Sequence, residues 1–161
     1  MTTHNILIVV HALGGVVSLI TGIILIIPSL HHNTRSHLLK VFLPALMVLV
    51  IGLFAVVIFD WQGFSLAQKI PFGVLCLLAL YMSWRAFQAY RVFQGQSEGW
   101  MALFVDHIGF NLISLFDGFV IVSSLDLGAP GWLVGLIAVV GVIAGIWAIN
   151  RVKAVGIKGT A

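Results

Sequence analysis

The sequence has few charged residues, four prolines and one cysteine, Cys76. Only 8% of its 161 residues are charged, whereas a soluble domain carries about a quarter. A water-soluble globular domain is therefore excluded. A hydrophobic content of 61% also excludes a disordered chain, and a single cysteine excludes a disulfide scaffold. Because a bilayer accommodates this much apolar surface, the sequence predicts an integral membrane protein.

Five apolar segments are long enough to cross the hydrocarbon layer as helices, which takes about 20 residues. They are residues 5–27, 39–59, 69–90, 101–124 and 131–150. A β-barrel would show short alternating segments, whereas these runs are continuous. The sequence predicts one all-α domain, a polytopic bundle of five transmembrane helices surrounded by membrane lipid. Pro44 and Pro71 are expected in the first turns of their spans, where a missing N–H is tolerated.

Basic residues predict the orientation of the bundle. With five spans, the first and third connections and the C-terminus share one side of the membrane. That side carries most of the basic residues: Arg35, Lys40, Arg85, Arg91, Arg151, Lys153 and Lys158. The other side carries Lys69. We expect the N-terminus outside and the C-terminus in the cytoplasm, in the cell's inner (plasma) membrane. The same bias explains the formal charge of +3 without a nucleic-acid partner.

The fourth span contains ionisable residues that are rare in hydrocarbon, where each costs several kcal/mol. His107, Asn111 and Ser114 recur at the three-and-four spacing of one helix face, and Asp117 adjoins Ser114. Asp106 lies nearer the cytoplasmic end, where water solvates it. Because such a face cannot point at lipid, the sequence predicts a polar seam inside the bundle.

The first span carries a matching stripe of small or polar residues: His11, Gly14, Gly15, Ser18 and Gly22. Small residues four apart let two helix backbones approach closely. The first and fourth spans run in opposite directions, which places His11 and Asp117 at a similar depth. The sequence therefore predicts that the two faces meet and that His11 and Asp117 share a proton or a hydrogen bond.

The main functional interpretation is a path or pocket for a proton, an ion or a small ligand, in a transport, sensing or binding role. It would use the polar residues of the two spans: His11, Ser18, His107, Asn111, Ser114 and Asp117. No P-loop, no nucleophile elbow and no dinucleotide fingerprint is present, which disfavours an enzyme.

Histidines near the cytoplasmic side support an alternative, a redox component that holds haem b or a metal ion. The residues concerned are His31, His32, His37 and His107. Their spacing matches no metal signature such as H-E-x-x-H. His11 lies about 15 Å away from His107 in depth, so these two cannot ligate one iron.

A third interpretation is an accessory or structural subunit in which the polar seam serves packing alone. Serine, asparagine and glycine at helix contacts often have only that role. Glycines of the fifth span are expected at a packing face or at a contact between copies of the chain: Gly131, Gly135, Gly141 and Gly145. Together with Gly14, Gly15 and Gly22, these faces predict helix packing and a homo-oligomer.

The opening of the chain resembles a known family. Its residues match the pattern H-x-x-x-G-x-x-[AS]-L-x-x-G: His11, Gly15, Ser18, Leu19 and Gly22. A basic, histidine-containing connection follows with Arg35, His37 and Lys40, and residues 81–91 are aromatic and basic. On these residues, about the first third of the chain plus that patch, it is similar to a bacterial integral-membrane family known as domain of unknown function 2306. Ile23 stands where that family often has proline. The resemblance implies a polytopic membrane protein in which His11 and His37 matter, and it implies no activity.

Overall fold

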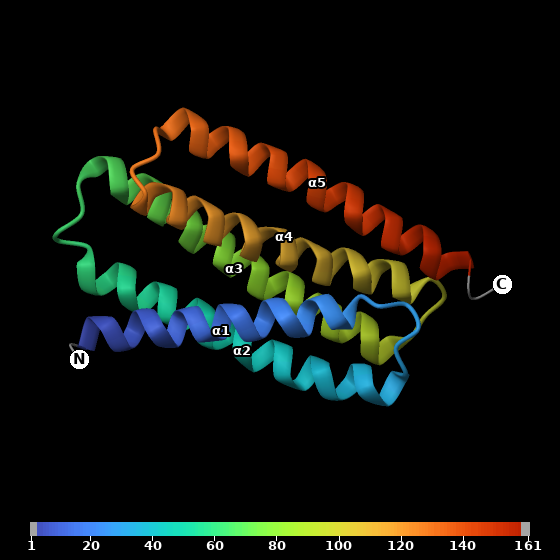
Figure 1. The fold of residues 1–161 in the computed structure, drawn as a ribbon. Coiled ribbons are helices and arrows are strands. Elements are labelled where there is room, and N and C mark those ends of the chain that lie inside the picture. Colours follow the sequence, from blue (N-terminus) through green and yellow to red (C-terminus); the bar gives the residue numbers. More distant parts are fainter. Residues whose placement is uncertain (1–2, 159–161) are drawn as a thin grey trace.

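The computed structural model describes residues 3–158, apart from the side chains at positions 3, 67, 68, 125, 126 and 155–158. It consists of five α-helices, drawn in Figure 1: α1 (Thr3–Leu25), α2 (His32–Asp60), α3 (Leu66–Gly95), α4 (Trp100–Asp126) and α5 (Gly131–Lys158). Each helix is long and apolar enough to cross a membrane. The predicted all-α class and the five membrane-length helices are confirmed.

Short connections join the helices, so each helix runs antiparallel to the next (Figure 1). The starts of α1, α3 and α5 lie at one end of the bundle, together with the ends of α2 and α4. We call this the N-terminal end and the opposite one the C-terminal end. Because the number of helices is odd, the chain begins at one end and finishes at the other.

Three helices extend beyond the apolar segments that predicted them. α2 begins at His32 instead of near residue 39, α3 continues to Gly95, and α5 runs to Lys158. Lysine, arginine and glutamine favour helix, so a helix continues readily past the apolar run. Basic residues that we expected in connections therefore lie on helical turns at the C-terminal end. The side chain of Lys158 lies outside the described part of the chain.

The two prolines lie deeper in their helices than expected. Pro44 is inside α2, which begins at His32, and Pro71 is inside α3, which begins at Leu66. The prediction of first-turn positions is wrong because polar residues extend both helices upstream of the apolar runs. A proline at position 44 leaves the carbonyl of Lys40 without its usual helical amide.

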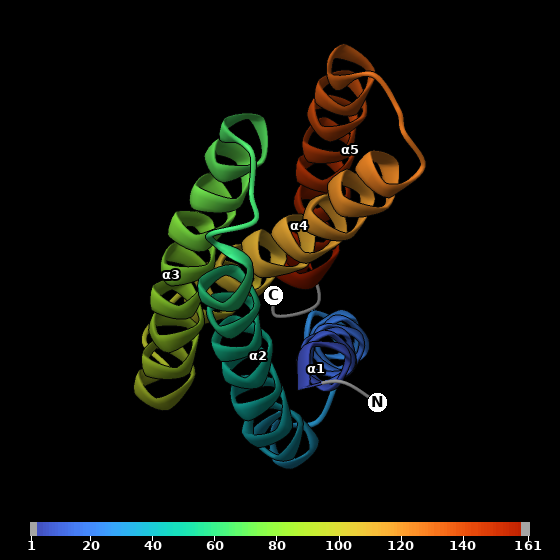
Figure 2. The same cartoon turned by 90° about the vertical axis from the view of Figure 1, so that its left-hand side faces the viewer.

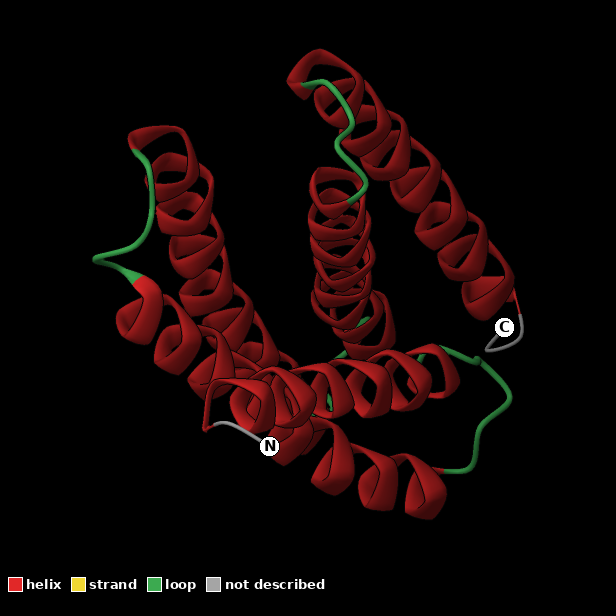
Figure 3. Ribbon diagram, turned by 60° about the vertical axis from the view of Figure 1, so that its left-hand side comes forward, coloured by secondary structure: helices red, strands yellow, loops and turns green. Residues whose placement is uncertain are grey.

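The hydrophobic core lies toward the C-terminal end of the bundle. The largest fully buried side chains there are Phe42, Phe104, Leu25 and Leu39, from α1, α2 and α4. Toward the N-terminal end, α4 and α5 diverge from α2 and α3, as the view onto that end shows (Figure 2) and as Figure 3 shows from another side. The bundle is therefore closed at one end and spread at the other.

Candidate functional site

His11 packs against α2. Its Nδ1 lies 2.8 Å from the carbonyl oxygen of Leu49. A carbonyl oxygen only accepts a hydrogen bond, so Nδ1 of the ring carries the proton. The contact is close because residue 52 is glycine: a Cβ there would lie 2.9 Å from the Cβ of His11. α2 thus fixes both the orientation and the tautomer of the imidazole.

The neighbouring glycines of the α1 stripe also face α2. A Cβ on Gly14 would lie 2.8 Å from the amide nitrogen of Leu49 and 2.9 Å from the carbonyl oxygen of Ala45. A Cβ on Gly15 would lie 3.0 Å from the side chain of Leu49. The small residues bring two backbones together as the spacing predicts, but the partner helix is α2 instead of α4.

Ser18 and Gly22 complete the stripe. Ser18 is fully buried, and its hydroxyl donates to the carbonyl of Gly14 at 2.7 Å within α1. Gly22 does reach α4, where an added Cβ would meet the side chain of Leu112. The expected meeting of α1 with α4 is therefore present at the C-terminal half of α1, through apolar atoms.

Asp117 lies between α4 and α5. Its side chain is 7% exposed, and a Cβ added at Gly141 would overlap its carboxylate. No hydrogen bond or ion pair joins Asp117 to another described residue. The predicted contact between His11 and Asp117 is wrong, because the two side chains occupy different helix interfaces.

The other polar residues of α4 lie beside the surface that contacts α3. They are His107, Asn111 and Ser114. Phe110 marks this side of α4, since its ring centroid lies 5.0 Å from that of Tyr81 and 5.1 Å from the guanidinium carbon of Arg85. Positions 107, 111 and 114 adjoin position 110 around the helix. These polar positions of α4 therefore lie next to its contact with α3, and Ser114 also lines a cavity to which α1 contributes.

Two buried polar atoms on this face have no hydrogen-bond partner within residues 3–158: Nδ1 of His107 and Oδ1 of Asn111. The amide nitrogen of the fully buried Asn111 side chain donates to the carbonyl of His107 at 3.0 Å, within α4. The two residues therefore make one local bond, and no continuous hydrogen-bonded chain links them to α1.

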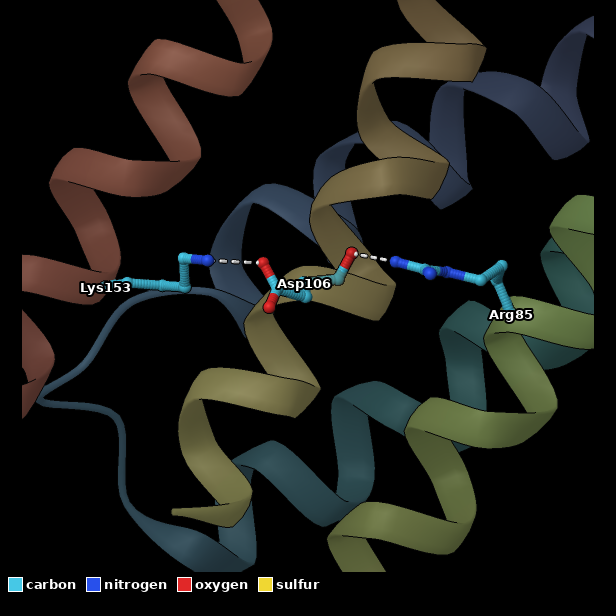
Figure 4. A network of polar contacts seen from close by, with 3 residues as sticks. All are labelled: Arg85, Asp106 and Lys153. Carbon is cyan, nitrogen blue, oxygen red and sulfur yellow. Dashed lines mark hydrogen bonds and ion pairs between the residues drawn. The ribbon is translucent and has the colours of Figure 1, made fainter.

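Asp106 links three helices near the C-terminal end (Figure 4). Its Oδ1 accepts from Nζ of Lys153 at 2.7 Å, and its backbone oxygen accepts from Nη2 of Arg85 at 2.8 Å. The side chains of Lys153 and Asp106 are 24% and 41% exposed, so water screens the pair. We expected Asp106 simply to be solvated, and it also joins α4 to α5.

A groove of about 410 Å³ lies where the bundle spreads toward its N-terminal end. We call it the lateral groove. It is lined by one face of each of four helices: by residues between 8 and 19 of α1, by Leu49 and Leu53 of α2, by residues between 75 and 82 of α3 and by residues between 114 and 123 of α4. Exposed side chains such as Val16 and Phe119 stand at its edge, so it opens on the apolar outer surface of the bundle.

Three polar side chains line the lateral groove among its apolar walls: Ser123 and the pair His11 and Ser114. Because Nδ1 of His11 donates to Leu49, Nε2 of the neutral ring is a hydrogen-bond acceptor. The hydroxyl of Ser114 makes no hydrogen bond within the described part of the chain. Sequence reasoning selected both residues, and the groove brings them together in a setting it did not predict.

The histidines of the first connection lie at the C-terminal end. His31, His32 and His37 are exposed, and the ring of His32 stacks on Phe93 with centroids 4.8 Å apart. Among residues 3–158, no three histidine, cysteine or acidic side chains are grouped so that they could hold a metal ion. The haem or metal interpretation of these histidines and of His107 stays a prediction.

The glycines of α5 divide into two groups. Gly141 faces Asp117 and Gly145 faces Ile113, both on α4. At Gly131 and Gly135, an added Cβ would meet no atom within 4 Å. Packing within the chain therefore accounts for two of the four glycines, and the homo-oligomer stays a prediction.

Arg35 has a structural role that the charge pattern did not reveal. It is 4% exposed, on α2. Its Nη2 donates to the carbonyl of Ile27 at 2.8 Å, and its Nε lies 3.4 Å from the carbonyl of Leu25. Carbonyls at a helix end have no helical amide to accept from. Arg35 therefore caps the end of α1 and ties it to α2.

In comparisons with known proteins, the chain matches no family model, no curated protein and no solved structure. The resemblance to domain of unknown function 2306 stays a prediction.

Proposed function

We propose that this protein binds a small lipophilic molecule that carries a hydroxyl group, and that the molecule enters the lateral groove from the bilayer. The observation that carries the proposal is the groove of about 410 Å³, with apolar walls and with His11 and Ser114 among its lining residues. Its volume falls within the range of small-ligand pockets, about 300–1,000 Å³.

The pair formed by His11 and Ser114 favours a hydroxyl-bearing ligand. Nε2 of neutral His11 accepts a hydrogen bond, and the hydroxyl of Ser114 both donates and accepts. A hydroxyl on the ligand matches this pair, since its hydrogen bonds to Nε2 while its oxygen accepts from Ser114. A ligand without polar atoms would leave both groups unsatisfied inside the groove.

The distribution of polar residues favours ligand binding over a proton or ion path. His11 is bonded to α2, and Asp117 lies against α5. His107 lies about one helical turn from Phe110, which packs against Arg85 of α3. A path needs successive groups within hydrogen-bond reach of one another, which these separate interfaces do not provide.

The orientation proposed for the bundle places the lateral groove in the outer half of the plasma membrane. Support comes from the basic residues, which are concentrated at the C-terminal end, because positively charged segments favour the cytoplasm. Exposed Trp84, Tyr90 and Trp147 lie toward that end on α3 and α5, where aromatic rings favour the membrane interface.

A steric block tests the proposal. Gly118 lines the groove, and an added Cβ would meet no atom within 4 Å, so the side chain of Gly118→Leu has an open start and extends into groove space. Gly73 of α3 has the same open surroundings and does not line the groove. We expect a photoactivatable fatty alcohol to label groove residues in the wild type. Gly118→Leu should reduce this labelling about tenfold, which corresponds to about 1.4 kcal/mol, and Gly73→Leu should leave it unchanged.

A matched histidine variant tests the polar contact. In His11→Asn, the amide nitrogen replaces Nδ1 as donor to Leu49, whereas the acceptor Nε2 is lost. We expect about a 2–10-fold loss of affinity for the fatty alcohol, the value of one hydrogen bond. Affinity for the corresponding alkane should not change. Equal labelling of the wild type and Gly118→Leu would overturn the proposal.

A further inference from the structure

α5 packs against α4 and against no other helix within residues 3–158. Figure 2 shows it set apart from α1, α2 and α3. Three close contacts line up along the pair, and in each a glycine receives a side chain of the other helix. They are Gly109 with Ile149, Ile113 with Gly145, and Asp117 with Gly141. The attachment of α5 therefore depends on one interface.

One of these three contacts involves a carboxyl group. Asp117 faces Gly141, which lies ten residues into α5, or about 15 Å from its start. Between Gly131 and Asn150, α5 has no titratable residue. α1 and α3 also contact α4, and none of their titratable side chains, including His11, Cys76 and Arg85, forms a hydrogen bond or ion pair with Asp117.

An ionised carboxylate in such a position is costly. Transfer of an unpaired charge into an apolar environment costs far more than transfer of the neutral acid. The helical amides of α4 and α5 are already bonded within their own helices, so neither backbone donates to the carboxylate. Gly141 has no side chain that could do so.

We propose that Asp117 is a proton-binding site that holds α5 on α4. With its proton, the carboxyl group packs into the space that Gly141 leaves open. Without it, the charge must reach water, and α5 separates from α4 in the N-terminal half of the bundle. The C-terminal half, where Gly109 packs against Ile149 and Lys153 pairs with Asp106, stays together.

A lipophilic carbodiimide tests for the proton without any substitution. Dicyclohexylcarbodiimide reacts with a protonated carboxyl group in hydrocarbon: the carboxyl oxygen bonds to the central carbon, the proton moves to nitrogen, and no group leaves. The product rearranges to a stable N-acylurea that peptide mass spectrometry locates. We expect the adduct on Asp117, and we expect its rate of formation to fall as the pH rises. Asp106, which pairs with Lys153, should carry no adduct. No adduct on Asp117 at any pH would overturn the proposal.

A distance measurement tests the release of α5. Phe116 and Val140 are exposed, on α4 and α5 respectively, and accept nitroxide labels on cysteines in a Cys76→Ala background. We expect a narrow distance distribution at acid pH that lengthens and broadens at alkaline pH. Asp117→Asn, which stays neutral, should remain narrow throughout. A wild-type distribution that does not change with pH, or an equal change in Asp117→Asn, would overturn the proposal.

Discussion

The helix pairs α1–α2 and α4–α5 pack alike, but only the first gives the titratable side chain beside its glycine a hydrogen-bond partner among the described residues. In both, glycines bring two helices together, and in both a titratable side chain lies beside such a glycine in the N-terminal half. His11 finds a partner in the carbonyl of Leu49. Asp117 packs against Gly141 and has no hydrogen-bond or ion-pair partner among the described residues. A carbonyl oxygen in an intact helix keeps a second lone pair for a donor, whereas every interior amide is already used. A neighbouring helix backbone can thus satisfy an imidazole N–H but not a carboxylate.

The largest expected effect comes from the α1–α2 side. Arg35→Gln removes a buried guanidinium, so that the carbonyl of Leu25 loses its side-chain donor and the carbonyl of Ile27 keeps only the amide of Leu30. We expect a loss of about 3 kcal/mol in the free energy of unfolding, since each buried group left unsatisfied costs about 1–3 kcal/mol. Thermal unfolding in detergent measures it. A loss no larger than that of Lys153→Gln would contradict the capping role.

Gly14→Ala breaks the same helix pair by steric overlap. The new Cβ would meet backbone atoms of Ala45 and Leu49, which cannot turn aside. We expect the helices to separate at a cost of about 1–3 kcal/mol, as for other overpacked cores. Gly73→Ala is the control, because its Cβ has open space, and it should be neutral or stabilising by up to about 1 kcal/mol. Equal unfolding temperatures for the two variants would contradict the close α1–α2 contact.

Gly141→Ala applies the same change to the α4–α5 pair and should cost less. The atom that its Cβ would meet is the mobile end of the Asp117 side chain, which can rotate away. We expect a loss below about 1 kcal/mol, within the range of most substitutions that avoid backbone clashes. Both variants should be measured under the same conditions. A larger loss of unfolding free energy for Gly141→Ala than for Gly14→Ala would contradict the contrast between the two helix pairs.

The smallest effect is expected for the ion pair that joins α5 to α4. Lys153→Gln removes the contact with Asp106, whose side chain is 41% exposed. Exposed pairs contribute about 0.2–1 kcal/mol, and salt should reduce the difference between Lys153→Gln and the wild type. A loss that persists in concentrated salt would indicate a contact shielded from water.

The sequence was sufficient to predict the five helices but not to predict which helices pack against each other. Long apolar runs predict membrane helices because hydrocarbon leaves the backbone no other way to satisfy its polar groups. The α1 stripe was correctly identified as a close-packing face, and its partner was wrong. Periodicity shows which side of a helix is special, whereas the packing partner depends on every other helix.

The burial of Arg35 could have been predicted from its spacing, but its positive charge favoured an exposed position. Buried residues of α2 recur at spacings of four, three and four, typical of one helix face: Arg35, Leu39, Phe42 and Leu46. The positive charge suggested a surface connection instead. The free carbonyls at the end of α1, which make burial of a guanidinium favourable, become visible only once the turn between α1 and α2 is known.

The proton on the His11 ring provides the most direct test of the account, because the proposed groove chemistry depends on a free Nε2. Solid-state nitrogen NMR of histidine-labelled protein in bilayers reports it, with the His11 signals assigned by their loss in His11→Asn. We predict that the neutral ring carries its proton on Nδ1 and that the Nε2 signal shifts when dodecanol is added. A neutral ring protonated on Nε2, or an Nε2 signal unmoved by saturating dodecanol, would contradict the account.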